Sequence, residues 1–402
     1  MKLIKLTLPL LIALAYAPAQ ATSLSDLLNF KGLTVFADTY IGGGADVSDA
    51  GNRTSVYGSI LSGDVATFGN GSSVTGNFES VGAANISSRV VGGVHNTSVG
   101  GNVTAGGVTT LADGGIINGY IISGDTATTG ANTYVKGNIS SAGVLTVGGT
   151  SSVGGNISSG GTATVSATST VTGTVTAVGV ITIGTPNSTG AVSHIDTSPV
   201  DTNSLVANIH KDVNGVATQV QNAQNAASAM GTGEVLDAVI GSRTFTPGVY
   251  SAASWSPTAG SIFTLDAGGK DNQTFVFNMT DILVFGAGTQ IVMKNAGKND
   301  TVVWNVTNGY AAVSANATVL GTILADTYIS VGAGATVTGV DAFSCGGVYS
   351  QTSYVSTGDG ASIGGGGCSA SSISAVPEPT SYAMMLAGLG LLGFAVSRKK
   401  QA

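Results

Sequence analysis

The stretch VKGNISSAGVLTVGGTSS at residues 135–152 is followed directly by VGGNISSGGTATVSATST at residues 153–170, so the chain carries an 18-residue repeat. The glycines of the shared Val-x-Gly triplet keep this spacing along the chain: Gly101, Gly119, Gly137, Gly155 and Gly173. A fixed period of this length is typical of a solenoid, in which each repeat forms one coil and stacks on its neighbours.

Apolar residues occupy alternate positions inside each repeat, as on strands with one face turned inward. In the repeat at 135–152 these residues are Val135, Ile139, Leu145 and Val147. Short strands of this kind, with glycine at the bends and about six residues per side, fit one coil of a parallel β-helix. We therefore predict a mainly β fold, a parallel β-helix with 18-residue coils, because a flat β-sandwich would not require so constant a step.

Two columns of residues are predicted to face outward. The first column is all threonine: Thr110, Thr128, Thr146, Thr164 and Thr182. Its rungs would lie about 4.8 Å apart on a flat, uncharged face, and threonine is rigid at χ1, so the column is a candidate surface for ice or for a surface polymer. Threonine is also an ordinary outward strand residue, and that alternative stays open. The second column is expected to form a structural ladder: Asn102, Tyr120, Asn138, Asn156 and Thr174.

The first residues have the order of a secretory signal peptide. Lys2 and Lys5 precede an apolar run at 6–16, and Ala19-Gln20-Ala21 offers a small-residue cleavage site with Ala19 and Ala21 at its key positions. We expect residues 1–21 to direct the chain to the secretion machinery and to be removed.

The C-terminal end carries a second targeting signal. Val376-Pro377-Glu378-Pro379 precedes an apolar run at 382–396 and a terminal basic cluster. The basic residues of that cluster are Arg398, Lys399 and Lys400. This layout resembles the PEP-CTERM sorting signal of Gram-negative bacteria, which implies recognition by an exosortase-type membrane transpeptidase and transfer to the cell envelope or extracellular matrix. A plain C-terminal membrane anchor is the alternative, and it leaves the body outside the cell as well.

The amino-acid composition limits the kinds of molecule that the protein is expected to bind. Only 9% of residues are charged and the net charge is −7, which argues against nucleic acid. Cys345 and Cys368 are the only cysteines, and in an oxidising compartment we expect them to form a disulfide that staples the last turn and protects an exposed end of the solenoid. We expect no metal site and no cofactor, because the histidines are few and scattered.

Apolar residues take a helical step over residues 200–230, for example at Leu205, Ile209, Val213 and Val216. N-cap candidates lie at 201–204, and Gly231 is a stop signal. We predict one long helix that lies along the solenoid.

Residues after this helix resemble the bacterial ice-binding-like adhesin family. The motifs that carry the resemblance lie at 245–250 (FTPGVY), 263–267 (FTLDA), 274–277 (TFVF), 301–306 (TVVWNV) and 319–325 (VLGTILA). The resemblance covers about residues 185–360 and implies a discontinuous right-handed β-helix with one long flanking α-helix. A related group of PEP-CTERM surface proteins with a choice of anchors is the closest alternative.

The expected organisation has four parts: a signal peptide at 1–21, a β-solenoid repeat region at 22–190, an ice-binding-like β-helix block at 191–370 and a sorting or membrane segment at 371–402. The array before the helix is longer than in the family and is similar to a bactofilin-type coil stack. Val319-x-Gly and Val337-x-Gly repeat the 18-residue step, so both β blocks could share one axis.

The sequence bears on three classes of function. The first is a surface-anchored ice-binding-like adhesin, with ice or an extracellular polysaccharide as the ligand. The second is a structural biofilm or matrix protein. Catalysis is not expected, because the carboxylates are spread out and no nucleophile elbow or phosphate loop appears; Asp46 and Asp49 give only a weak hint of Ca²⁺ binding.

Overall fold

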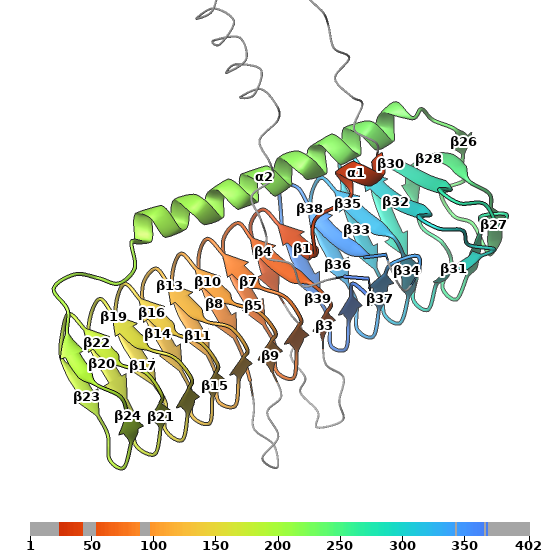
Figure 1. Ribbon diagram of the computed structural model, residues 1–402. Helices are drawn as coiled ribbons and strands as arrows, with labels where there is room; N and C mark the ends of the chain where they lie inside the picture. The colour runs from red at the N-terminus through yellow and green to blue at the C-terminus, as the bar shows by residue number, and fades with distance from the viewer. Residues whose placement is uncertain (1–23, 43–53, 89–96, 342–343, 366, 369–402) are drawn as a thin grey trace, which may run out of the picture.

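Each 18-residue repeat forms one coil of a parallel β-helix, as predicted. The computed structural model describes residues 24–42, 54–88, 97–341, 344–365 and 367–368. In these ranges the coils stack into an elongated β-solenoid, along which the long helix α2 (Thr202–Ala229) lies (Figure 1). The short helix α1 (Leu24–Leu27) precedes the first coil.

Strands of successive coils stack into three walls. The helix wall lies under α2 and contains β1 (Leu33–Ala37), β4 (Ser59–Ser62), β7 (Phe78–Ser80), β10 (Val103–Ala105), β13 (Ile121–Ser123), β16 (Ile139–Ser141), β19 (Ile157–Ser159), β22 (Val175–Ala177), β25 (Val192–His194), β26 (Glu234–Val235), β28 (Gly248–Trp255), β30 (Thr274–Phe285), β32 (Thr301–Val306), β35 (Thr322–Ala325) and β38 (Gly347–Ser350).

The open wall contains β2 (Ile41–Gly42), β5 (Ala66–Phe68), β8 (Ala84–Ile86), β11 (Thr109–Leu111), β14 (Ala127–Thr129), β17 (Leu145–Val147), β20 (Ala163–Val165), β23 (Ile181–Ile183), β33 (Tyr310–Val313), β36 (Ile329–Val331) and β39 (Val355–Thr357). The long strands β28 and β30 bend from the helix wall into it, since the end of β30 pairs with β33.

The third wall contains β3 (Ser55–Val56), β6 (Ser73–Val74), β9 (Ser98–Val99), β12 (Ile116–Ile117), β15 (Tyr134–Val135), β18 (Ser152–Val153), β21 (Thr170–Val171), β24 (Ser188–Thr189), β27 (Arg243–Phe245), β29 (Ile262–Asp266), β31 (Gln290–Lys294), β34 (Thr318–Leu320), β37 (Thr336–Thr338) and β40 (Ser362–Ile363).

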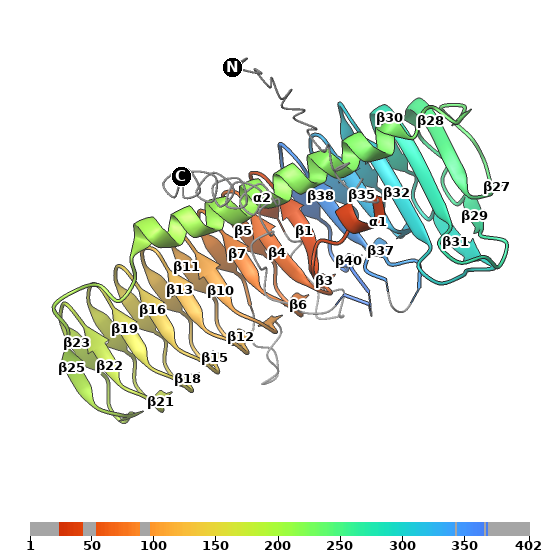
Figure 2. The same cartoon turned by 45° about the horizontal axis from the view of Figure 1, so that its top comes forward.

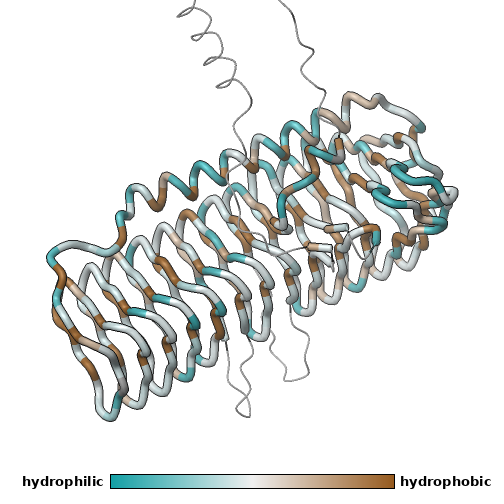
Figure 3. Tube along the Cα trace, viewed as in Figure 1, coloured by the Kyte–Doolittle hydropathy of each residue, from teal (hydrophilic) through white to brown (hydrophobic). Residues whose placement is uncertain are grey.

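The register confirms the 18-residue coil. Ile121 pairs with Ile139, Ile139 with Ile157, and Ile157 with Val175, and all four side chains are buried in the interior. Hydrophobic positions accordingly recur from coil to coil in Figure 3. The repeated glycine has a steric cause as well, because a Cβ at Gly155 would overlap Asn138 Oδ1 and the backbone of Gly137 in the previous coil.

The first described coil, which begins with β1, lies in the middle of the solenoid. A first block of coils runs from β1 to one end at β25, and α2 then returns along the middle of the solenoid, from the coil of β13 to the coils of β30 and β32 (Figures 1 and 2). A second block runs from β26 back to the middle, where β38, β39 and β40 pair in parallel with β1, β2 and β3. The two β blocks therefore form one continuous solenoid, the question that the sequence left open.

The disulfide joins Cys345 to Cys368, on either side of this last coil. The expectation that it protects an exposed end was wrong. The outer edge of that coil is already covered by β1, β2 and β3, so the disulfide closes the junction between the two blocks.

Helix α2 confirms the predicted flanking helix. Asp201 caps it, and its carboxylate accepts hydrogen bonds from the backbone N–H groups of Asn203 (3.1 Å) and Ser204 (3.3 Å). The apolar side of the helix buries Ile209, Val213, Val216, Val220, Ala223 and Ala227. These side chains pack on a cluster that includes outward residues of the helix wall: Phe36, Leu61, Val303, Leu324 and Tyr349.

Candidate binding surface

Only one wall is both regular and uncovered in the part of the chain that the structure describes. α2 covers the helix wall from β13 to β32. Ser198, in the segment before α2, lies against the next part of this wall at Gly160, and the outward residues there are mixed: Ile122, Ser140, Ser158 and Thr176. The third wall is chemically irregular, since its outward register position changes residue type from coil to coil: Ser98, Ile116, Tyr134, Ser152, Thr170 and Ser188. The open wall carries the predicted threonine column, and the structure brings its five members into register: Thr110, Thr128, Thr146, Thr164 and Thr182.

The threonine column is flat because its flanks are small or β-branched. Each threonine is the middle residue of a three-residue strand whose two neighbours point inward. Thr110 and Thr182 are exposed, while the three threonines between them are half-buried by their neighbours. The residue before each strand is valine or threonine, and the residue after it is alanine, glycine or serine. Five rungs at about 4.8 Å extend the column over about 20 Å.

The same outward position continues into the second block, as far as Val284, without a charged residue. Beyond Thr110, the register carries it through Asn85, Thr67, Gly42, Ser356, Ser330, Ala312 and Val284. The open wall is therefore one uncharged strip to which both blocks contribute.

A ladder of tyrosines lies beside this strip in the second block, and the sequence prediction missed it. Backbone hydrogen bonds place Tyr310, Tyr328, Tyr354 and Tyr40 at the rung position that is occupied by Val108 and Thr126 in the repeat region. The rings of Tyr310 and Tyr328 stack with centroids 4.6 Å apart, and those of Tyr328 and Tyr354 stack at 5.0 Å. Burial and the two neighbouring phenols raise the pKa of Tyr328. The ladder presents hydroxyl groups and ring edges beside the uncharged strip.

The asparagine column has a structural role. Asn102 Oδ1 accepts the backbone N–H of Tyr120 at 3.1 Å, and Asn138 Oδ1 accepts that of Asn156 at 2.8 Å. Asn156 Oδ1 accepts the N–H of Thr174 at 2.9 Å. The side chains thus satisfy backbone donors of the following coil, as expected.

Acidic groups meet beneath the helix. Burial raises the pKa of Glu79, on the helix wall, to about 7, and the Asp212 carboxylate on α2 adds to this shift. Burial raises the pKa of Asp212 as well, while Lys211 opposes that shift. These two carboxyl groups are a poor catalytic pair, because α2 covers the wall on which they meet.

Several predicted features lie outside the described residues: the signal peptide with Ala19 and Ala21, the sorting segment from Val376 to Lys400, and Asp46 with Asp49. Within the described ranges, no three His, Cys, Asp or Glu side chains come close enough to hold a metal ion. No helix in those ranges is long and apolar enough to cross a membrane.

Comparison with known proteins gave two family matches. A family model described as ice-binding-like matches residues 121–357, and the PEP-CTERM protein-sorting motif matches residues 375–399. No curated protein sequence matches the chain.

Among solved structures, the chain is similar to an ice-binding protein from the Antarctic ascomycete Antarctomyces psychrotrophicus, with 21% identity over 52% of this chain and 92% of that chain and a TM-score of 0.31. An ice-binding protein domain of Shewanella frigidimarina gives 24% identity over 49% and 87%, with a TM-score of 0.33. An ice-binding protein from an Antarctic Flavobacteriaceae bacterium gives 15% identity over 85% and 98%, with a TM-score of 0.30.

Proposed function

This chain belongs to the ice-binding-like family, and from that premise we propose that it is a non-enzymatic surface protein whose open wall adsorbs to ice through the threonine column. The observation that carries the proposal is the register of Thr110, Thr128, Thr146, Thr164 and Thr182 on a wall that α2 leaves uncovered.

The column suits a solid lattice better than a small ligand. A small ligand needs a concave pocket with a few convergent polar groups, whereas this surface is flat and repeats one group at one spacing. Threonine methyl and hydroxyl groups have few rotamers, so an array of them loses little conformational entropy when it orders water. Charged side chains, which hold water in their own geometry, are absent from the strip among the described residues.

Thermal hysteresis and inhibition of ice recrystallisation test the proposal on the purified chain, with a heat-unfolded sample as the blank. The double variant Thr146→Lys and Thr164→Lys places two charges in the centre of the column and should abolish both activities. Thr170→Lys is the matched control, because Thr170 is an exposed outward residue of the third wall in the same repeats. Full activity in a folded column variant contradicts the assignment.

The PEP-CTERM motif implies export to the cell surface. We propose that an exosortase-type transpeptidase recognises Pro377-Glu378-Pro379 and that this step anchors the protein. Replacing both prolines by alanine should leave the tail uncleaved and the protein in the inner membrane fraction. Normal surface display of that variant contradicts the proposal.

The tyrosine ladder favours a second candidate, a matrix protein that binds an extracellular polysaccharide. Stacked rings leave a row of hydroxyl groups and ring edges along the solenoid axis, and such a row can hydrogen-bond a sugar chain that runs parallel to it. Co-sedimentation with the exopolysaccharide of the producing cell tests this candidate. Tyr328→Ala and Tyr354→Ala should reduce binding if the ladder is the site, while Thr146→Lys should not.

A further inference from the structure

The two ends of the solenoid differ in how their interior is capped. At the far end of the first block, the last coil is formed by β23, β24 and β25, which pair only with the preceding coil among the described residues. Val192 occupies the inward register position after Val175, yet 49% of its surface is exposed, whereas Val175 is fully buried. Ile181 and Ile183 are also only partly buried. The interior of the solenoid is therefore open at this end, and Figure 3 colours much of the last coil as hydrophobic.

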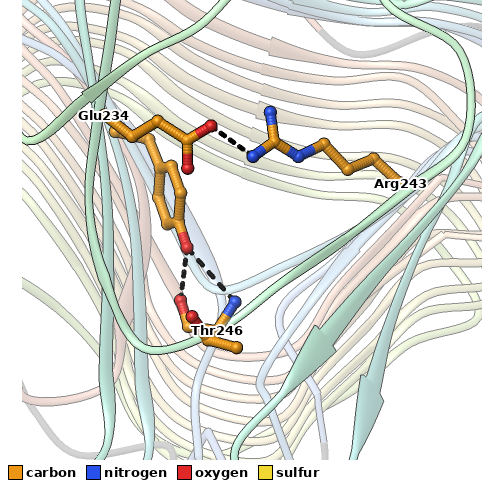
Figure 4. A network of polar contacts seen from close by, with 4 residues as sticks. Glu234, Arg243 and Thr246 are labelled. Atoms are coloured by element: carbon orange, nitrogen blue, oxygen red, sulfur yellow. Dashed lines mark hydrogen bonds and ion pairs between the residues drawn. The ribbon is translucent and has the colours of Figure 1, made fainter.

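The opposite end is closed by polar contacts and a loop. Glu234 and Arg243 form an ion pair across the mouth, where the Tyr250 hydroxyl also donates to the Thr246 carbonyl at 2.6 Å (Figure 4). Leu236 enters the core beneath the ion pair, and Ile240 packs against it. This end is capped by its own chain.

The open end also lacks the usual protection of a strand edge. Natural sheets place charges on their edges to prevent pairing with another chain. Residues 176–193 contain no aspartate, glutamate, lysine or arginine, and Val180 is 66% exposed. Uncharged edges on three sides of an apolar interior form a surface that is suited to burial.

We infer that two copies of this chain dock through their open ends to form a closed head-to-head dimer. The partner has to offer three strand edges at the same triangular spacing around an apolar centre, and a second copy of the coil at 178–194 offers them. A twofold axis across the solenoid axis makes the facing strands antiparallel, which is a sound pairing geometry, and an isologous contact of this kind ends at two copies. The capped end does not compete, because Glu234 and Arg243 would have to be buried.

Dimerisation extends the proposed ice-binding role without depending on it. A head-to-head dimer would place two open walls on one rigid rod about twice as long.

Sedimentation velocity of the exported full chain, as purified from the expressing cells, tests the inference. The expected result is a monomer–dimer equilibrium with no larger species. Val192→Lys places a charge over the open interior and should yield monomers at every concentration, with the far-UV circular dichroism spectrum unchanged. Val235→Lys is the matched control, because Val235 is 74% exposed at the capped end, and this variant should still dimerise.

Three outcomes would overturn the inference. The first is a wild-type chain that stays monomeric at high concentration. The second is a dimer that survives Val192→Lys in a folded protein. The third is a concentration-dependent series of larger species that Val235→Lys abolishes, since that pattern belongs to head-to-tail stacking. A loss of ice activity in any variant does not bear on the dimer, so the two proposals fail separately.

Discussion

The two blocks fill the same solenoid in different ways. In the first block the coils from β10 to β22 are 18-residue repeats, and they enclose valine, isoleucine, leucine and alanine side chains. In the second block the register passes from Tyr250 to Phe277 and then from Phe277 to Trp304, a 27-residue step each time. Longer coils enclose a wider interior, and a cluster of stacked aromatic rings fills it, with Phe277 and Trp304 centroids 4.1 Å apart. In these 27-residue coils the core therefore requires a larger side-chain volume than in the 18-residue coils.

Truncating the aromatic core should have the largest effect. Trp304→Ala removes a fully buried ring that stacks on Phe277 and Trp255 and whose Nε1–H donates to the Leu320 carbonyl at 2.8 Å. We expect a loss of about 3–5 kcal/mol in the free energy of unfolding, against about 0.5–1.5 kcal/mol for Ile157→Val in the first block.

Chemical denaturation followed by two probes measures this contrast. Both tryptophans lie in the second block, so tryptophan fluorescence reports on that block, while far-UV circular dichroism reports on the whole solenoid. Equal losses for Trp304→Ala and Ile157→Val would contradict the difference between the cores. Separate transitions for the two probes would show that the blocks unfold independently.

Opening the junction should have the next largest effect. Replacing Cys345 and Cys368 together by serine removes the crosslink beside the coil that joins the blocks, at a cost of about 3 kcal/mol. Amide hydrogen exchange should accelerate first in β1 and β38, whose pairing joins the blocks, and should change least at β16 and β19. Uniform acceleration along the solenoid would mean that the disulfide does not act locally.

The helix-covered carboxyl pair predicts a pH dependence of the first block. The pKa of Glu79 is about 7 in the folded protein and about 4.5 in the unfolded chain, so folding favours the protonated form. This contribution is complete below pH 4.5, falls as the pH rises towards 7 and is lost above it. Asp212, whose pKa is also raised, acts in the same direction; Lys211 opposes it, and Tyr120 is a third titratable neighbour.

Glu79→Gln should therefore raise the free energy of unfolding at pH 8 by about 2 kcal/mol, after allowance for the partial exposure of the carboxyl, and change it little at pH 4.5. Thermal melts across this range measure the effect. Asp113→Asn is a control at a carboxylate that accepts a backbone N–H of the next coil away from α2. If Glu79→Gln leaves the pH dependence of the melting temperature unchanged, the raised pKa of Glu79 is not its cause.

Local repetition made much of the fold predictable. The Val-x-Gly step identified the coil, the inward residues and the threonine column, because each feature depends only on residues that lie one repeat apart. The helical spacing from Leu205 onward identified α2, because it also depends only on residues that are close in the sequence.

Contacts between segments that lie far apart in the sequence were not predictable from such periodicity. Tyr40 joins Tyr354 on one ladder only because β2 pairs with β39, a contact between the two ends of the described chain. Tyr310 and Tyr328 do lie one 18-residue step apart, so that half of the ladder carried a signal. Glu79 and Asp212 meet because α2 folds back over the first block. The prediction for the disulfide was wrong because the coil of β38, β39 and β40 is covered by the coil of β1, β2 and β3.

The smallest expected effect concerns the asparagine column of the first block. Asn138→Ala removes the acceptor for the Asn156 N–H and should cost about 1 kcal/mol, since water can replace part of the bond at this exposed site. Tyr120 interrupts the ladder, because a phenol has no amide carbonyl to offer Asn138. Tyr120→Asn should restore the missing rung and raise the melting temperature, which scanning calorimetry can measure. If both substitutions shift the melting temperature in the same direction, side-chain packing rather than these hydrogen bonds keeps the 18-residue coils in register.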